Sequence, residues 1–351
     1  MPLFSVTEFD RHVYSTELQD FLPDQIIDIH THLWLDEHKN HTADEFSRVV
    51  SWPFKVAKDN SIDDLQETYR LMFPGKQVTP LMFSNASQAD DIDRLNKYVQ
   101  ESAAAAGYPA LLFTPPWWSG GELESKIAGG GFLGVKVYLN LSPSYIPMPE
   151  IRIFDFLTPG HLHVLNRLGL IAMLHIPRNG RLKDPVNIEQ IIEINRNFPR
   201  VKLVLAHVGR AYCPEDLGDA FERLKKCDGL LWDFCANTNG DVFTELLRSF
   251  SYEQIMFGSD LPILRMRMRR ICENGSYINI VPKGLYGDVS GDPHMREVAG
   301  AEAERLTFFM YEELRAMKQA CTACGIPPAG REALFYTNAK RVLGSVGYML
   351  S

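Results

Sequence analysis

Two histidines one residue apart end a short apolar run near the start of the chain. The run, residues 26–32, reads IIDIHTH and carries His30 and His32. In a β-strand, residues i and i+2 project to the same face, so these two imidazoles would lie side by side. Paired imidazoles are typical ligands of a divalent metal ion. The spacing alone is weak evidence, because His161 and His163 share it in a segment that we expect to be helical, where such side chains diverge.

Three later apolar runs also end in a residue that can bind a metal. His175 ends the run LIAMLH, His207 ends VKLVLAH, and Asp260 ends IMFGSD. A polar side chain that closes an otherwise apolar strand is costly to bury unless it is paired or liganded. Taken singly, each histidine is most simply a hydrogen-bonded core residue. Together, four histidines and an aspartate at the ends of different strands predict one common metal site.

The elements that must position these residues are eight short apolar runs separated by amphipathic segments. Most runs lack polar alternation, as expected of parallel strands covered on both faces. Eight such units indicate an α/β fold of the (β/α)8 TIM barrel type, in which the carboxyl ends of the strands meet at one mouth. No glycine-rich phosphate loop follows any run, which disfavours a doubly wound nucleotide-binding fold. The expected strands are Ile26–Ile29, Val78–Phe83, Ala110–Thr114, Gly134–Leu139, Leu170–His175, Val201–His207, Leu230–Phe234 and Ile255–Gly258.

Length and composition fit one barrel with additions. The 351 residues are 45% hydrophobic and 23% charged, which excludes a disordered chain, a collagen and a coiled coil. We expect a single domain over residues 1–351, with a helical cap inserted after the first strand at residues 38–75. A long loop is expected at residues 265–300, after the eighth strand, because this segment is rich in turn residues. C-terminal helices are expected at roughly Ala301–Ala320 and Arg331–Leu343.

Charge and cysteine content bear on partners and location. The formal net charge of −8 argues against a binder of nucleic-acid backbones. No stretch approaches the roughly 18 apolar residues of a membrane span, and the first residues lack the pattern of a secretory signal. The six cysteines form no disulfide scaffold, and the Cys321–Cys324 pair lacks the second pair of a zinc site. We therefore expect a reduced, cytoplasmic protein that binds a small-molecule substrate; a homo-oligomer is compatible with the sequence.

The order of the strand-end residues resembles a known superfamily. H-x-H on the first strand, histidine on the fifth and sixth, and aspartate on the eighth resemble the amidohydrolase superfamily of metal-dependent barrels. The segments LPDQIIDIHTH, FPRVKLVLAH, FGSD and NAKRVLG are similar to its amidohydrolase-related (amidohydrolase 2) branch, which also contains the aminocarboxymuconate-semialdehyde decarboxylase group. The resemblance covers residues 22–344 and is specific for the superfamily, not for a substrate.

This resemblance implies a ligand set and a proton carrier. His30, His32, His175 and Asp260 would bind a divalent ion, with zinc expected from the imidazole ligands and manganese or iron as alternatives. Such an ion lowers the pKa of bound water toward about 7, and Asp260 would take the proton and pass it to the leaving group. His207 would either bind a second ion or polarise the substrate.

Asp28 lies two residues before His30 and shares its strand face. It either anchors a ligand imidazole through a hydrogen bond or packs at the amino-terminal end of the barrel. The sequence leaves both interpretations open.

Lys136 is the most ambiguous residue, because it lies inside the fourth expected strand, where an unpaired ammonium is costly. In binuclear members such as dihydroorotase, a lysine on this strand carries a carbamate that bridges two metals, and His207 would then be a ligand. Alternatively, a carboxylate neutralises Lys136, or the lysine contacts an anionic substrate. We expect one ion rather than two, because the opening and closing segments fit the amidohydrolase-related branch better than dihydroorotase.

Substrate contacts are expected from four side chains near the strand ends. Arg178 and Arg210 each follow a strand-end histidine by three residues and are placed to bind a carboxylate, while Tyr138 and Trp34 are placed to line an apolar site. The expected function is hydrolysis of a small, carboxylate-bearing organic substrate. The alternatives are a decarboxylase (a lyase) of an aromatic or unsaturated carboxylic acid, and a catalytically inactive barrel that binds a metabolite.

Overall fold

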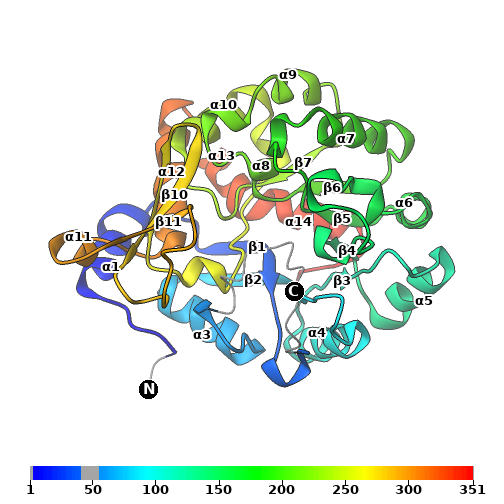
Figure 1. Cartoon of the computed structure of the whole chain (residues 1–351), viewed down its shortest axis with the longest axis horizontal. Helices are drawn as coiled ribbons and strands as arrows, with labels where there is room; N and C mark the ends of the chain where they lie inside the picture. Colours follow the sequence, from blue (N-terminus) through cyan, green and yellow to red (C-terminus); the bar gives the residue numbers. More distant parts are fainter. Residues whose placement is uncertain (1–2, 41–54, 351) are drawn as a thin grey trace.

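The eight expected strands form the centre of the fold in the computed structural model, which describes residues 3–40 and 55–350 (Figure 1). Strands β3 to β8 pair in parallel and in chain order, and β1 pairs with β2 in parallel. Bridges at Met82–Ala110 and Thr31–Leu261 close the circle. The predicted (β/α)8 barrel is thereby confirmed. Its strands are β1 (Gln25–His32), β2 (Gln77–Phe83), β3 (Leu112–Phe113), β4 (Gly134–Val137), β5 (Ile171–Leu174), β6 (Lys202–Leu205), β7 (Leu231–Asp233) and β8 (Ile255–Met256).

Helices between the strands form the outer layer, and their ends carry clear sequence signals. In α4, the side chain of Asp91 accepts a hydrogen bond from the backbone of Arg94, and the helix ends at Gly107, whose φ of 68° favours glycine. The other helices of the layer are α5 (Gly120–Gly130), α6 (Pro159–Leu168), α7 (Pro185–Asn197), α9 (Ala220–Leu224) and α10 (Gly240–Ser249), with α4 at Ile92–Ala106. The short segment α8 (His207–Arg210) lies instead at the end of β6.

The expected cap at residues 38–75 is described only in part, because residues 41–54 lie outside the described residues. A 3-10 turn at Asp36–His38 comes before that segment, and helix α3 (Ile62–Met72) follows it. Ser61 and Asp64 form a reciprocal capping box at the start of α3. The helical character expected after the first strand is therefore present in α3.

The expected long loop at residues 265–300 is instead a three-stranded sheet made of β9 (Arg269–Glu273), β10 (Ser276–Pro282) and β11 (Met295–Val298). β9 and β10 form an antiparallel hairpin around Asn274 and Gly275, which both have positive φ. An Asn-Gly pair between two extended segments predicts a β-hairpin, and the prediction of a loop was wrong here.

A disulfide ties this sheet to the barrel. Cys272 of β9 is bonded to Cys213, which follows α8, with 5.8 Å between their Cα atoms. The expectation of a wholly reduced chain is therefore wrong for this pair. The remaining four cysteines are free, Cys321 and Cys324 among them.

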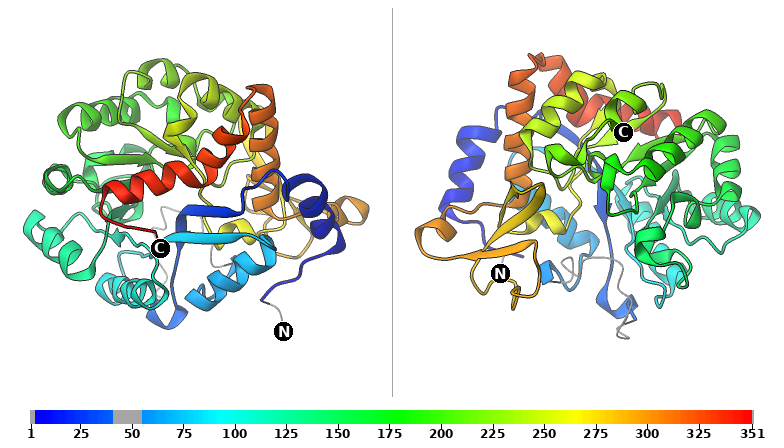
Figure 2. Two further views of the ribbon diagram at one scale, coloured as in Figure 1. Left: turned by 180° about the vertical axis from the view of Figure 1, so that it is seen from behind. Right: turned by 45° about the horizontal axis from the view of Figure 1, so that its top comes forward.

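The termini add helices around the barrel. The first is α1 (Glu8–Val13), and the expected helix Ala301–Ala320 is two helices, α11 (Ala301–Glu304) and α12 (Phe309–Ala323). After α13 (Pro328–Glu332), α14 (Asn338–Ser345) lies across the strands (Figure 2), where Val342 and Leu343 join a buried cluster with Ile27, Met173 and Val204. In the described parts of the chain, no helix is both long and apolar enough to cross a membrane.

Candidate active site

Three of the predicted ligands converge between β1 and the end of β8. Asp260 Oδ1 lies 3.2 Å from His32 Nε2 and 3.4 Å from His30 Nε2. Two backbone hydrogen bonds hold the strands together here, from the Asp260 amide to the His30 carbonyl and from the His32 amide to the Leu261 carbonyl. Gly258 permits this close approach, because a Cβ at that position would lie 2.8 Å from His30 Cβ.

The hydrogen bonds of the two imidazoles fix which nitrogens carry protons. His30 Nδ1 lies 2.9 Å from Asp233 Oδ2, and His32 Nδ1 lies 3.2 Å from the Ser84 carbonyl oxygen. Because both partners are acceptors, we assign the proton of each neutral ring to Nδ1. The Nε2 lone pairs of both rings then face the Asp260 carboxylate, and three facing acceptors call for a cation between them.

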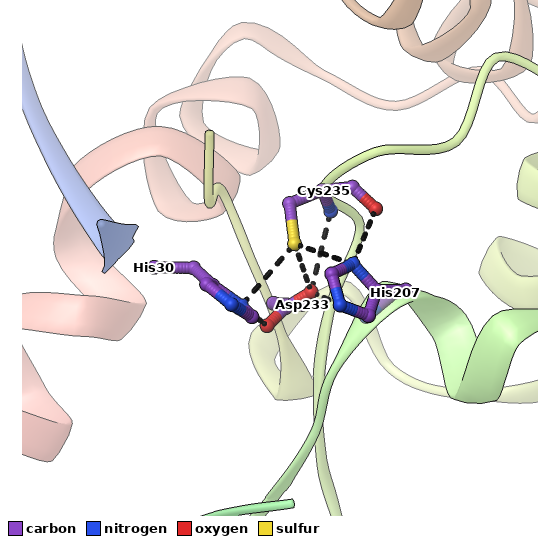
Figure 3. A group of neighbouring side chains, drawn as sticks. All are labelled: His30, His207, Asp233 and Cys235. Atoms are coloured by element: carbon purple, nitrogen blue, oxygen red, sulfur yellow. Dashed lines mark hydrogen bonds and ion pairs between the residues drawn. The ribbon is translucent and has the colours of Figure 1, made fainter. Parts of the chain in front are cut away.

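Asp233 and Cys235, which the sequence analysis missed, complete a second group with His30 and His207 (Figure 3). Asp233 Oδ1 accepts hydrogen bonds from the His207 amide at 2.7 Å and from the Cys235 thiol at 2.9 Å. The thiol sulfur also lies 3.1 Å from His207 Nδ1. Asp233 thus orients the imidazole of His30 and the backbone of His207. An aspartate inside the apolar run LLWDF was the available signal.

Asp28 does not contact a ligand imidazole. Its Oδ1 accepts hydrogen bonds from the backbone of His30 at 3.1 Å and of Ser259 at 2.8 Å, and its Oδ2 accepts one from the Tyr69 hydroxyl. Asp28 therefore braces the backbones of β1 and of the segment after β8, next to His30 and Asp260.

His207 and Arg210 are positioned by a strained turn. α8 is left-handed, with φ of 59° at His207, 50° at Val208, 60° at Gly209 and 60° at Arg210. A positive φ at a β-branched residue is a clear outlier, and such strain persists only where the surroundings enforce it. Asp260 also has a positive φ, of 52°. The backbone strain therefore gathers at the strand ends that carry these side chains.

His175 stands at the edge of the site. Its ring centroid lies 5.2 Å from that of His207 and 4.5 Å from that of Tyr138. Among the described residues, it belongs to neither group of closely spaced donor atoms. Its Nδ1 is buried without a hydrogen-bond partner. Such an orphaned nitrogen beside the converging donors fits a site that holds an ion or water.

The electrostatics suit a metal ligand set. Burial lowers the pKa of all four histidines, with the Lys136 charge adding to the effect at His30 and the Arg210 charge at His175. For Asp260, burial acts to raise the pKa, but the ring proton of His32 and the charges of His207 and His30, in the protonated forms of these rings, outweigh it and hold the pKa below its usual range. A bound cation takes the place of those ring protons. Neutral imidazoles and an ionised carboxylate are the protonation states that metal binding requires, so these residues fit a divalent ion.

Lys136 is fully buried on β4, and its Nζ lies 3.0 Å from His30 Nε2 and 4.8 Å from the centroid of the Phe83 ring. No carboxylate of the described residues forms an ion pair with it. Burial lowers its pKa to about 8. The lysine therefore competes with a metal ion for the same lone pair of His30.

Of the four expected substrate contacts, two make structural contacts and two lie beside the candidate metal ligands. Arg178 is paired with Asp184, at 3.0 and 3.1 Å, and Trp34 is fully buried with its indole N–H donating to the Lys58 carbonyl. Both make structural contacts. Tyr138 packs on His175, and Arg210 Nη1 donates to the loop carbonyls of residues 176–178. These two lie beside the candidate ligands.

A buried carboxyl group behind the site yields a stability prediction. Both oxygens of Glu313 on α12 are buried without a hydrogen-bond partner. Burial raises its pKa well above 4.5; the nearby Ala236 amide lowers it in part, and the charges of Asp28, Asp233 and Asp260 raise it further. The folded state thus keeps a proton that the unfolded state releases, so this group costs stability as the pH rises above 4.5.

We therefore expect Glu313→Gln to raise the melting temperature at pH 7.5, by on the order of 2 °C. The gain should shrink as the pH falls toward 4.5. Thermal melts of both proteins across this pH range measure it, with Glu332→Gln on exposed α13 as the control. A gain that does not change with pH would show that Glu313 is not held neutral.

Solved structures of known proteins share the fold of this chain. No curated protein matches the chain in sequence. Similar solved structures include a dihydroxybenzoic acid decarboxylase from Polaromonas sp. JS666 with bound manganese and the inhibitor 2-nitroresorcinol (TM-score 0.53, 13% identity, covering 93% of this chain and 100% of that chain). An amidohydrolase from Burkholderia multivorans with bound zinc is also similar (TM-score 0.56, 14% identity, 91% and 99%). So is 4-oxalomesaconate hydratase from Rhodopseudomonas palustris (TM-score 0.53, 15% identity, 92% and 96%).

At these identities, the structural likeness shows a shared fold. The family model of the amidohydrolases, by contrast, matches this sequence over residues 27–345, nearly the whole barrel. The chain belongs to the amidohydrolase family.

Proposed function

We propose that the protein is a metal-dependent enzyme that hydrolyses a small, carboxylate-bearing organic substrate at the mouth of the barrel. The observation that carries this proposal is the convergence of three acceptor atoms: His30 Nε2 and His32 Nε2 lie 3.4 and 3.2 Å from Asp260 Oδ1. These residues would hold the ion together with His175. Zinc is favoured by the imidazole donors, with manganese or iron as alternatives.

The residues around this site have distinct chemical roles. When bound, a divalent ion lowers the pKa of water and polarises an oxygen of the substrate. Asp260, which stays ionised, accepts the proton from the attacking water and returns it to the leaving group. His207 Nδ1 faces the Cys235 carbonyl and thiol, so Nε2 is the nitrogen left for the substrate, which it polarises when the ring is protonated. Arg210 supplies positive charge beside His175.

Decarboxylation of an aromatic or unsaturated acid is the second candidate. It is supported by the similarity to a dihydroxybenzoic acid decarboxylase and by His207, which in its protonated form has a proton on Nε2 to give to the carbon from which CO2 leaves. In that reaction the C–C bond to the carboxylate breaks, its electron pair stays on the substrate, and a proton replaces CO2.

Turnover of a panel of esters, lactones, amides and aromatic acids tests both candidates. Hydrolysis incorporates one oxygen from 18O-labelled water into a product and releases no CO2. Decarboxylation releases CO2 and leaves the remaining product unlabelled. No turnover of any compound by the metal-loaded protein would count against both and favour a barrel that only binds a metabolite.

We expect one metal ion per chain, with Lys136 unmodified. Its Nζ lies 3.0 Å from His30 Nε2, and a second cation next to this ammonium would be disfavoured. Metal analysis of the purified protein with and without added bicarbonate, paired with intact-mass measurement, checks this. Two ions per chain together with the added mass of CO2 would instead establish a carbamate, with His207 as a ligand of the second ion.

A further inference from the structure

Arg270 of β9 lies in a box of aromatic rings. Its guanidinium carbon stands 4.6 Å from the ring centroid of Tyr212, 4.7 Å from Tyr277 and 4.6 Å from Phe309. The rings come from three separate elements: the segment after α8, strand β10 and helix α12. Three faces of this kind hold a guanidinium in one place and orientation.

The hydrogen bonds of Arg270 leave most of its donors unused. Nε donates to Asn279 Oδ1 at 2.8 Å and Nη1 donates to the Ala236 carbonyl at 2.6 Å. A guanidinium has five N–H donors, so three have no partner among the described residues. Burial lowers the pKa of this side chain, but it is only partly buried, and Nη2, which has no hydrogen-bond partner among the described residues, is not enclosed.

The neighbouring Arg181 has a carboxylate partner, which Arg270 lacks. Arg181 stands against the same two tyrosines, at 4.9 Å from the Tyr277 centroid, and is paired with Asp216. Arg270 forms no ion pair with any carboxylate of the described residues. Arg270 is thus a fixed, half-buried cation without a counterion.

Its location ties it to the candidate active site. The carbonyl that it holds belongs to Ala236, the residue after Cys235, and Ala236 has a positive φ of 52°. Tyr212, whose ring centroid lies 4.6 Å from the Arg270 guanidinium carbon, follows Arg210 by two residues, and its amide donates to the Arg210 carbonyl at 3.0 Å. The chain thus brings Arg270 close to the Arg210 segment, and neither arginine forms an ion pair with a carboxylate of the described residues.

We propose that Arg270 is a substrate-binding residue that selects a dicarboxylate, with one substrate carboxylate on Arg270 and the other on Arg210. The proposal rests on the proposed function, since it places the substrate at the same site. A guanidinium with free N–H donors binds a carboxylate through two parallel hydrogen bonds, and the aromatic box sets the plane in which that carboxylate lies.

Calorimetric titration of the purified, metal-containing protein with isophthalate and with benzoate tests this. Neither probe needs to react, so the result does not depend on whether hydrolysis is the right reaction. The wild type is expected to prefer isophthalate. Arg270→Gln should weaken isophthalate binding at least about tenfold while benzoate changes less than twofold. Arg270→Lys keeps the charge but loses the planar guanidinium, so its affinity for isophthalate should lie between those of the wild type and of Arg270→Gln.

Arg269→Gln is the matched control, because Arg269 is the preceding residue of β9 and its side chain is half exposed beside Glu302. It should leave both affinities unchanged. The proposal is overturned if the wild type binds the two probes equally or binds neither, or if Arg270→Gln leaves isophthalate binding intact. It is also overturned if Arg270→Gln and Arg270→Lys both lose metal, or if both bind isophthalate and benzoate equally more weakly. Arg270 would then only position the Ala236 segment.

Discussion

Replacing His32 with alanine is expected to remove the bound metal and the activity together, while the barrel still folds. The variant deletes one of the two Nε2 donors that face Asp260. Loss of a direct ligand should weaken metal affinity by more than about 100-fold, since changes in residues that merely orient ligands already cost 10–100-fold. Metal analysis, turnover and a circular dichroism spectrum of the same preparation measure the three outcomes.

His163→Ala provides the control, because this exposed histidine belongs to the other H-x-H pair, on α6, where its ring packs on Phe198. It should keep metal and activity. His30→Ala should lose metal as His32→Ala does, but should also destabilise the fold, because His30 is buried and bonded to Asp233. Full metal content in both ligand variants would refute the assignment of the site.

Asp260→Asn is expected to retain some metal but to lower kcat by on the order of 100-fold or more, the effect of removing a general base. The amide keeps an oxygen near His30 and His32 but does not accept a proton in the relevant pH range. Turnover measured from pH 5 to 9 on metal-loaded protein checks this, with the exposed Asp241→Asn on α10 as the control. Near-normal turnover across the range would show that another group carries the proton.

The barrel was predictable because its strands are buried on both faces. Each expected apolar run overlaps one observed strand, from Ile26–Ile29 in β1 to Ile255–Gly258 in β8, although the observed strands β3 to β8 are all shorter than expected. His30, His32 and Asp260 were found by the same logic, since a polar side chain that ends such a run needs a partner. Barrel topology then brings the strand ends together.

The missed residues depend on contacts that span the chain. Asp233 lies 203 positions from His30, and nothing local shows that its carboxylate meets that imidazole. Arg270 ends the basic run RMRMRR, residues 265–270, and its surroundings are set by Tyr212 and Phe309 on other elements. The pairing of Cys213 with Cys272 likewise follows from the placement of β9 and not from cysteine spacing.

The sheet of β9, β10 and β11 carries Arg270 and Tyr277 but none of the candidate metal ligands, and a covalent bond fixes it to the barrel at Cys213. With Arg270 in its proposed role, part of substrate recognition lies on this sheet, apart from the metal-binding strand ends. Residues 269–298 could diverge, or be exchanged by an engineer, to admit a different acid without altering the metal-binding strand ends. On this proposal, the barrel supplies the reaction chemistry, and the appended sheet helps to set which acid is bound.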